Sequence, residues 1–286
     1  PNYFVMKNTT ITPMMQQWQA CKEKARDALL LFRLGDFYEA FHDDAVKMAR
    51  ELHLTLTSRQ NIPMCGVPMH AAEQYLDKLI AKGHKIAIAE QMEDAKNVKG
   101  LVSREIVRFI SPGSIIQSRL LSEKTNNFFV SITQFDAKFA IASIDLTTAE
   151  FRVMDSEQLY EILNEVHRLR PAEMLISKTF EKEQTRFIKE LKQEFSFFLN
   201  VQDDSLFDFS KREQTLEEHF LVASLDIYSL KDAAVCAAGG LLQYLKEHLY
   251  VDLSQIKKIE PTQFSGFLAM DHVCLRNLNI FPTKES

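Results

Sequence analysis

Residues 28–41 read ALLLFRLGDFYEAF, and the fold of the first part of the chain follows from this stretch. The apolar run Ala28–Leu34 has the length and composition of a buried strand. Gly35 and Asp36 break the run, because both residue types favour tight turns. Two acids, Asp43 and Asp44, then begin a predicted helix. Their negative charges stabilise the positive N-terminal end of its dipole. The segment between them is therefore predicted to lie in a turn that joins a strand to a helix.

This segment places two aromatic rings beside a carboxylate, at Phe37, Tyr38 and Glu39. In a strand or a tight turn, residues two apart project to the same side. Phe37 and Glu39 can then point out of the fold together, while Tyr38 and Phe41 point inward. The alternative is that all the rings belong to the core, since most aromatic side chains are buried.

An exposed Phe at such a position can act as a wedge. Phe side chains enter between base steps from the minor groove of DNA and kink the duplex. A carboxylate beside the ring would be repelled by phosphates, so it is useful there only as a hydrogen-bond partner of a base. The pair would then exchange binding affinity for discrimination between bases.

The sequence on both sides predicts a compact α/β block. Thr12 and Pro13 have the residue types of a helix N-cap and first turn, and Thr55–Thr57 is a short β-branched strand. The segment Arg59–Met69 contains two prolines and a glycine and is predicted to be an ordered loop. A helix and two strands follow, at residues 71–82, 84–91 and 106–110.

A second pattern begins near residue 128. Three short strands, at residues 128–133, 139–145 and 150–154, form an antiparallel meander, after which helices and strands alternate. A meander followed by β-α-β is typical of an RNase H-like layout. The expected class is therefore α/β, with a mixed α/β domain at 1–115, a linker at 116–127, an RNase H-like domain at 128–258 and the beginning of a further domain at 259–286.

Composition excludes several classes of protein. Hydrophobic residues make up 46% of the 286 residues and charged residues 26%, as in soluble globular proteins. The four cysteines include no CxxC pair, which argues against structural zinc and a secreted disulfide framework and favours a reduced, cytosolic compartment. No apolar run has the length of a membrane span, so no membrane partner is expected. The net charge is −5, but residues 1–115 hold 15 Lys and Arg against 13 Asp and Glu.

Several motifs occur in an order known from one family. TPMMQQW, LLLFRLGDFYEAFHDDA, LTLTSRQ, IPMCGVPMH, KIAIAEQMED and KGLVSREIVRFISPG follow one another between Thr12 and Gly113. This order resembles the N-terminal domain of the MutS family of DNA mismatch repair proteins. FVSITQFDAKFAIASIDLTTAEF and AAGGLLQYL are similar to the family's connector domain, and FLAMDHVCLRNLNI to the entry of its core domain. Ala149 stands where the connector usually has a glycine, so the turn before Glu150 is expected to be altered.

The resemblance implies a set of DNA contacts. Phe37 would stack on a mispaired or unpaired base, Glu39 would hydrogen-bond that base, and Met64 would flank the mismatch. Arg59, Lys99 and Arg108 are plausible contacts to phosphates. No residue is assigned a catalytic or metal-binding role.

The resemblance also implies partners and cofactors. The sequence has no GxxxxGK[ST] phosphate loop, and the family carries its ATPase in a C-terminal domain, so the chain is expected to be a non-catalytic fragment or an incomplete sequence. ATP and Mg²⁺ are expected in that missing domain and no cofactor in this chain. The expected partners are double-stranded DNA with mismatches or small unpaired loops, a second copy of the protein, and a MutL-like repair protein at the connector. The expected location is the cytoplasm, in association with the nucleoid.

Two other functions stay open. An RNase H-like nuclease would need a carboxylate cluster that holds two metal ions; Asp145 and Asp136 are its nearest candidates, although Asp145 is interpreted as a turn residue. A paralogue of the same fold could instead bind other DNA structures. The presence of both Phe37 and Glu39 argues against this paralogue.

Overall fold

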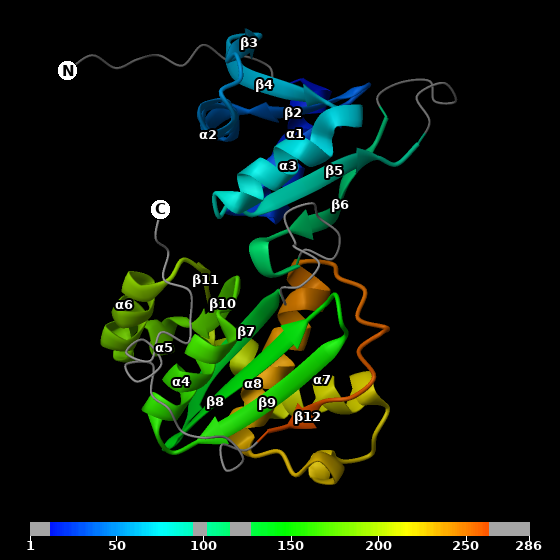
Figure 1. Ribbon diagram of the computed structural model, residues 1–286. Coiled ribbons are helices and arrows are strands. Elements are labelled where there is room, and N and C mark those ends of the chain that lie inside the picture. Colours follow the sequence, from blue (N-terminus) through cyan, green and yellow to red (C-terminus); the bar gives the residue numbers. More distant parts are fainter. Residues whose placement is uncertain (1–11, 94–101, 115–126, 263–286) are drawn as a thin grey trace, which may run out of the picture. The chain divides into compact units, whose positions relative to one another are not determined.

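The structure, a computed structural model, describes residues 12–93, 102–114 and 127–262 (Figure 1). The chain divides into two compact units, Pro1–Ile110 and Ser111–Ser286. Each unit is built on a six-stranded sheet that contains both parallel and antiparallel neighbours. The expected α/β class is therefore confirmed for both units.

The first unit contains three helices and six strands among its described residues. In chain order these are α1 (Pro13–Ala25), β1 (Leu29–Leu34), β2 (Phe37–Phe41), α2 (His42–Leu52), β3 (Thr57–Arg59), β4 (Ile62–Pro68), α3 (Ala72–Ala81), β5 (Ile86–Gln91) and β6 (Arg104–Ile110). The strand order is β3-β4-β2-β1-β5-β6. Strands β1 and β2 form a hairpin, and Gly35 in its turn has a φ of +61°, which glycine adopts without a Cβ penalty.

Three predictions for this unit were wrong. The strand predicted at residues 55–57 begins only at Thr57, as β3. The segment that follows Asp36 is strand β2 rather than a turn, so the turn consists of Gly35 and Asp36 alone. The predicted loop at 59–69 contains strand β4. Its two prolines, Pro63 and Pro68, stand within one residue of a strand end, where proline removes few ladder hydrogen bonds.

Helices cover both faces of the first sheet. Helix α1 packs on the face that carries Phe41, whose ring meets the Trp18 ring edge-on with centroids 6.1 Å apart. Helix α2 packs on the opposite face, where the Cys65 thiol donates a hydrogen bond to the carbonyl of Ala45 at 3.3 Å. Strand β2 thus lies between two layers of helix in the middle of the unit (Figure 1).

The second unit has the expected RNase H-like layout. Its elements are β7 (Phe128–Phe135), β8 (Lys138–Asp145), β9 (Glu150–Ser156), α4 (Leu159–Leu169), β10 (Glu173–Ser177), α5 (Lys178–Glu183), α6 (Thr185–Glu194), β11 (Phe198–Gln202), α7 (Phe209–Phe220), α8 (Asp232–Gln243) and β12 (Glu260–Pro261). The strand order is β11-β10-β7-β8-β9-β12. Strands β7 to β9 form the antiparallel meander, and β10 and β11 run parallel to β7.

The core of this unit lies on both sides of its sheet. Residues of α4, α5 and α6 join an apolar cluster with strand residues such as Ile132 and Ile176. Helix α8 lies on the other face, buried between the sheet and α7 (Figure 1). At Gly239 a Cβ would stand 2.6 Å from the Cβ of Arg212 on α7, so the AAGG segment serves close helix packing.

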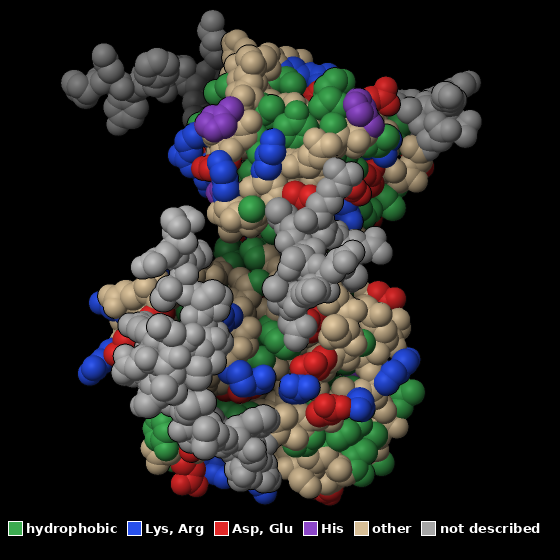
Figure 2. Space-filling view, viewed as in Figure 1, with side chains coloured by type: hydrophobic (Ala, Val, Ile, Leu, Met, Phe, Trp, Pro, Cys, Tyr) green, Lys and Arg blue, Asp and Glu red, His purple; other side chains and the backbone are tan. Residues whose placement is uncertain are grey.

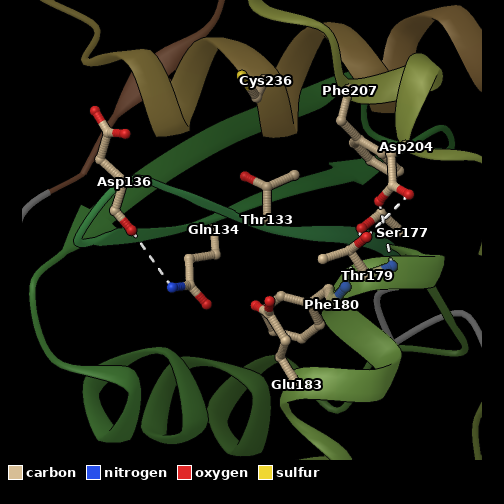
Figure 3. Close-up of a pocket in the computed structure, with 10 residues that line it drawn as sticks. All are labelled: Thr133, Gln134, Asp136, Ser177, Thr179, Phe180, Glu183, Asp204, Phe207 and Cys236. Atoms are coloured by element: carbon tan, nitrogen blue, oxygen red, sulfur yellow. Dashed lines mark hydrogen bonds between the residues drawn. The ribbon is translucent and has the colours of Figure 1, made fainter.

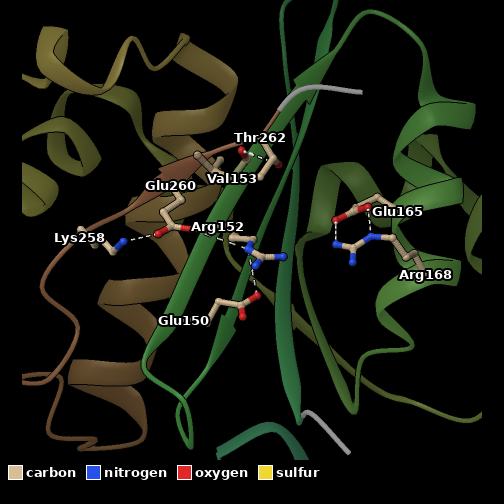
Figure 4. Close-up of polar contacts among 8 residues, drawn as sticks. All are labelled: Glu150, Arg152, Val153, Glu165, Arg168, Lys258, Glu260 and Thr262. Carbon is tan, nitrogen blue, oxygen red and sulfur yellow. Dashed lines mark hydrogen bonds and ion pairs between the residues drawn. The ribbon is translucent and has the colours of Figure 1, made fainter. Parts of the chain in front are cut away.

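The chain returns to the second sheet after α8. The backbone N–H of Thr262 donates to the carbonyl of Val153 at 2.8 Å, and Arg152 pairs with Glu150 at 3.1 Å (Figure 4). Residues 259–262, predicted to begin a further domain, therefore pack with this unit. Residues 263–286 and positions 116–126 of the predicted linker lie outside the described residues.

The turn between β8 and β9 is held by a buried aspartate. Asp145 has no exposed surface, and its carboxylate accepts hydrogen bonds from the backbone N–H of Asn127 (3.1 Å) and of Thr147 (2.8 Å). Ala149 in the same turn has a φ of +60°. The turn therefore forms without the glycine that the family pattern has there, but alanine carries the cost of a left-handed backbone.

This strain generates a prediction. Ala149→Gly should raise the free energy of unfolding by about 0.5–1 kcal/mol, because release of left-handed strain exceeds the added flexibility of the unfolded chain. Urea unfolding of the chain measures the change. Ala137→Gly in the preceding hairpin turn is the control; its φ is negative, so the same substitution should lower stability. Destabilisation by both substitutions would contradict the strain at Ala149.

Side chains on the face of β2 that carries Tyr38 fix the hairpin. Arg33 Nη1 donates to Glu90 Oε2 at 2.9 Å, and Arg33 Nε donates to the carbonyl of Gly35 at 3.2 Å. The Tyr38 hydroxyl donates to the other oxygen of Glu90. Burial and this hydrogen bond raise the pKa of Tyr38 to about 12. The turn and the start of β2 are thus tied to strand β5.

Tyr38→Phe should lower the free energy of unfolding by about 1 kcal/mol, the typical net value of one hydrogen bond. Because the folded-state pKa is raised, this stabilisation is present below pH ~10 and is lost as the pH rises through about 12. Ultraviolet titration should show a tyrosine ionisation near pH 12 in the wild type that is missing in the variant. The control Tyr75→Phe should leave that ionisation in place; its persistence in Tyr38→Phe would contradict the assignment.

Candidate nucleic-acid interface

Strand β2 presents Phe37 and Glu39 on one face and Tyr38 and Ala40 on the other. The second pair is buried, whereas 46% of the Phe37 surface is exposed. Phe41 shares the face of Phe37 but is covered by helix α1. The prediction that Phe37 points outward while Tyr38 and Phe41 are buried is therefore confirmed, and the alternative that all the rings are core is wrong for Phe37. Glu39 projects from the same face as Phe37, as predicted, but its side chain is mostly buried.

The strand register brings two more predicted residues to the same face. Glu39 lies opposite Gly66 and Phe41 opposite Met64, and side chains of paired residues share a face. Strand β3 continues the face on the far side of β4, where Arg59 is paired with Ile62. Phe37, Glu39, Met64 and Arg59 thus occupy one face of the sheet.

Glu39 is held by an ion pair on this face. Arg59 Nη1 lies 3.3 Å from Glu39 Oε2, and the Glu39 side chain is mostly buried while that of Arg59 is half exposed. Burial raises the pKa of the Glu39 carboxyl, and the Arg59 guanidinium opposes this rise. The carboxyl therefore combines a raised pKa with a position next to an exposed aromatic ring.

Gly66 provides room for the Glu39 side chain. A Cβ at Gly66 would stand 3.3 Å from Glu39 Cγ and 3.2 Å from the carbonyl oxygen of Tyr38. Sequence reasoning did not identify Gly66 as part of the site. Its signal is a glycine inside the PMCGVP segment, which is recognisable only once that segment is known to be a strand next to β2.

The structure does not bring Arg108 to this face. Arg108 on β6 pairs with Ile88, and Ile88 pairs with Leu31. The partner of Glu39 on β1 is the next residue, Phe32, so Arg108 lies on the opposite face of the sheet from Glu39. Lys99 lies outside the described residues. Figure 2 shows basic side chains of the first unit scattered among acidic, polar and apolar ones, without a continuous basic patch on the face in view.

The second unit contains a cleft of about 400 Å³ at the carboxyl ends of β7, β10 and β11 (Figure 3). An RNase H-like nuclease would be expected to hold its ligands at this edge of the sheet. Of the acids there, Asp136 directs its carboxylate away from the other lining residues, and Asp204 accepts hydrogen bonds from the N–H (3.2 Å) and hydroxyl (3.0 Å) of Thr179.

The described part of the chain does not contain the carboxylate cluster that the nuclease alternative requires. No group of three His, Cys, Asp or Glu there could hold a metal ion. Asp145, its nearest candidate, is paired with Phe128 at the amino end of β7, which is the opposite edge from the cleft. Its carboxylate holds the β8–β9 turn, as the interpretation of Asp145 as a turn residue predicted.

The described helices include none that is both long and apolar enough to cross a membrane.

Comparison with known proteins relates both units to one family. The family model described as MutS domain I matches residues 12–119, and the model described as MutS domain II matches residues 127–257. The chain is 47% identical over 277 residues to a DNA mismatch repair protein MutS of Protochlamydia amoebophila. The matched region covers 96% of this chain and 32% of that protein.

Other relatives carry the same name. Identity is 44% over 252 residues to the MutS protein of Chlamydia pneumoniae, covering 86% of this chain and 30% of the relative. It is 38% over 285 residues to that of Lachnoclostridium phytofermentans, covering 96% and 30%. The chain thus spans about a third of the length of these relatives. With domains I and II matched in order, the chain belongs to the MutS family.

Proposed function

We propose that this chain is the mismatch-sensing part of a DNA mismatch repair protein. The observation that carries the proposal is the half-exposed ring of Phe37 on an anchored strand, next to the carboxyl of Glu39. The substrate is double-stranded DNA with a mismatch or a small unpaired loop. The names of the relatives, all mismatch repair proteins, support the same function.

The proposed wedge discriminates between base steps by the free energy needed to unstack and bend them. A mispaired step is poorly stacked, so inserting Phe37 and bending the duplex there costs less than at a matched step. Unstacking costs on the order of a few kcal/mol per step, and a defect that removes part of this cost supplies the discrimination. Strand β2 suits this role because Tyr38 and Arg33 anchor its start to Glu90. The Phe37 ring would therefore enter the DNA from a rigid strand.

Glu39 would contact the displaced base. An ionised carboxylate only accepts hydrogen bonds, whereas a protonated one can donate as well. The raised pKa of Glu39 favours the protonated form, which phosphates do not repel. Met64, on the same face, would pack beside the mismatch. Arg59, Lys99 and Arg108 would contact phosphates and add affinity without sequence preference.

The remaining parts of the proposal belong to the whole protein. ATP and Mg²⁺ would bind in a C-terminal ATPase domain, two copies would hold DNA as a homodimer, and a MutL-like protein would dock on the connector. This chain itself would perform no catalysis and would act in the cytoplasm on nucleoid DNA. A paralogue that binds other DNA structures is the second candidate. It would not need both Phe37 and Glu39, so their presence together argues against it.

Phe37→Ala should reduce the preference for heteroduplex over homoduplex DNA. Base–aromatic stacking contributes about 1–3 kcal/mol per base, so the affinity ratio should fall by roughly 5- to 150-fold. Fluorescence anisotropy with the intact protein that contains this chain measures both affinities. The control Val46→Ala removes an equally exposed apolar side chain from α2, on the opposite side of the sheet, and should leave the ratio unchanged. An unchanged ratio in Phe37→Ala would contradict the wedge.

A further inference from the structure

The ion pair between Arg59 and Glu39 gives Arg59 a second role besides phosphate contact. The two residues are 20 positions apart and lie on β3 and β2, with β4 between them in the sheet. Gly66 on β4 lies directly opposite Glu39, and a Cβ there would stand 3.3 Å from Glu39 Cγ. The pair therefore spans a neighbouring strand, and the carboxyl proposed to touch a base is engaged by a cation on its own face of the sheet.

This pair is weaker than its neighbour on the other face. Arg33 and Glu90 approach to 2.9 Å and are reinforced by Tyr38. Arg59 and Glu39 make a single contact at 3.3 Å, and half of the Arg59 side chain is open to solvent. Guanidinium groups bind phosphate through two parallel hydrogen bonds. A DNA phosphate can therefore compete with Glu39 for Arg59, whereas the ion pair between Arg33 and Glu90 stays formed.

We propose that Arg59 is a positioning residue that holds Glu39 ionised against the sheet and, on moving to a DNA phosphate, releases its carboxyl to take a proton from solvent and donate a hydrogen bond to the mispaired base. The inference rests on the proposed mismatch function. Pairing also cancels the carboxylate charge while the protein approaches the DNA, which reduces its repulsion by phosphates.

Among the described residues, Arg59 is the charged group that shifts the pKa of Glu39, although Arg104 lies on the same face. Across β1 the neighbour of Glu39 is Phe32, and across β4 it is Gly66. Arg33 and Glu90 lie on the opposite face with Tyr38. Arg104, which lies over the Phe32 ring, donates to the carbonyls of Arg33 and Val102.

Loss of Arg59 therefore has a predictable sign. Burial raises the pKa of Glu39 and Arg59 lowers it, so removal of the guanidinium leaves burial unopposed. The carboxyl should then become protonated at a higher pH. A lysine at this position keeps the positive charge and should restore most of the effect.

The first experiment follows the Glu39 carboxyl by NMR titration of the whole chain. We expect its midpoint to rise in Arg59→Gln and to return toward the wild-type value in Arg59→Lys. Arg50→Gln, which removes an exposed arginine paired with Glu51 on α2, should leave the midpoint unchanged. An identical midpoint in the wild type and Arg59→Gln would overturn the inference.

The second experiment measures the heteroduplex-to-homoduplex affinity ratio of the intact protein against pH. The ratio should decline above the pH at which free Glu39 loses its proton. In Arg59→Gln the onset should move to higher pH by the difference between the two NMR midpoints. A residue that only contacts phosphate would lower both affinities without moving the onset, and this result would overturn the inference.

Two further variants separate this inference from the function on which it rests. Glu39→Gln should flatten the pH profile, and Phe37→Ala should lower the ratio at every pH. If neither variant changes the ratio, the mismatch function itself fails. If both act as expected and Arg59→Gln leaves the onset in place, the inference about Arg59 alone fails.

Discussion

The alternation of side chains along strand β2 is the constraint on which the candidate site depends. Because Tyr38 is tied inward to Glu90, its neighbours Phe37 and Glu39 must project from the other face. A shift of one residue would bury the ring of Phe37 and expose Tyr38. The same contact joins β2 to β5 across β1, so the hairpin is anchored to the centre of the sheet. The exposed ring is thus the result of a partly buried hydrogen bond on the opposite face of β2.

The face in front of β2 combines features that a nucleic-acid surface of this kind requires. Phe37 supplies an apolar ring, Glu39 a polar group with a raised pKa, and Arg59 a half-exposed positive charge. Gly66 leaves room for the Glu39 side chain. The first 115 residues have almost no net charge, so electrostatic attraction by this part of the chain is modest. Discrimination by stacking and hydrogen bonding fits such a surface better than strong unspecific binding.

Much of this arrangement could be predicted from the sequence. The spacing of two residues already placed Phe37 and Glu39 on one side, and the family resemblance added Met64 and Arg59. The contact between Glu39 and Arg59 was not predictable, because it depends on the register of three strands. That register follows from the turn at Gln60 and Asn61, which both have a positive φ, and from a strand with prolines near both ends. In the second unit the meander was predicted, but the left-handed alanine in the β8–β9 turn required coordinates.

The central claim is that the Phe37 ring enters the base stack at a weakened step. An experimental structure of the intact protein on a heteroduplex tests it most directly. We expect a kinked duplex with the Phe37 ring stacked on the mispaired base, the Glu39 carboxyl within hydrogen-bonding distance of that base, and Tyr38 still bonded to Glu90. A bound duplex in which the Phe37 ring lies outside the base stack, or in which Glu39 contacts no base, would contradict it.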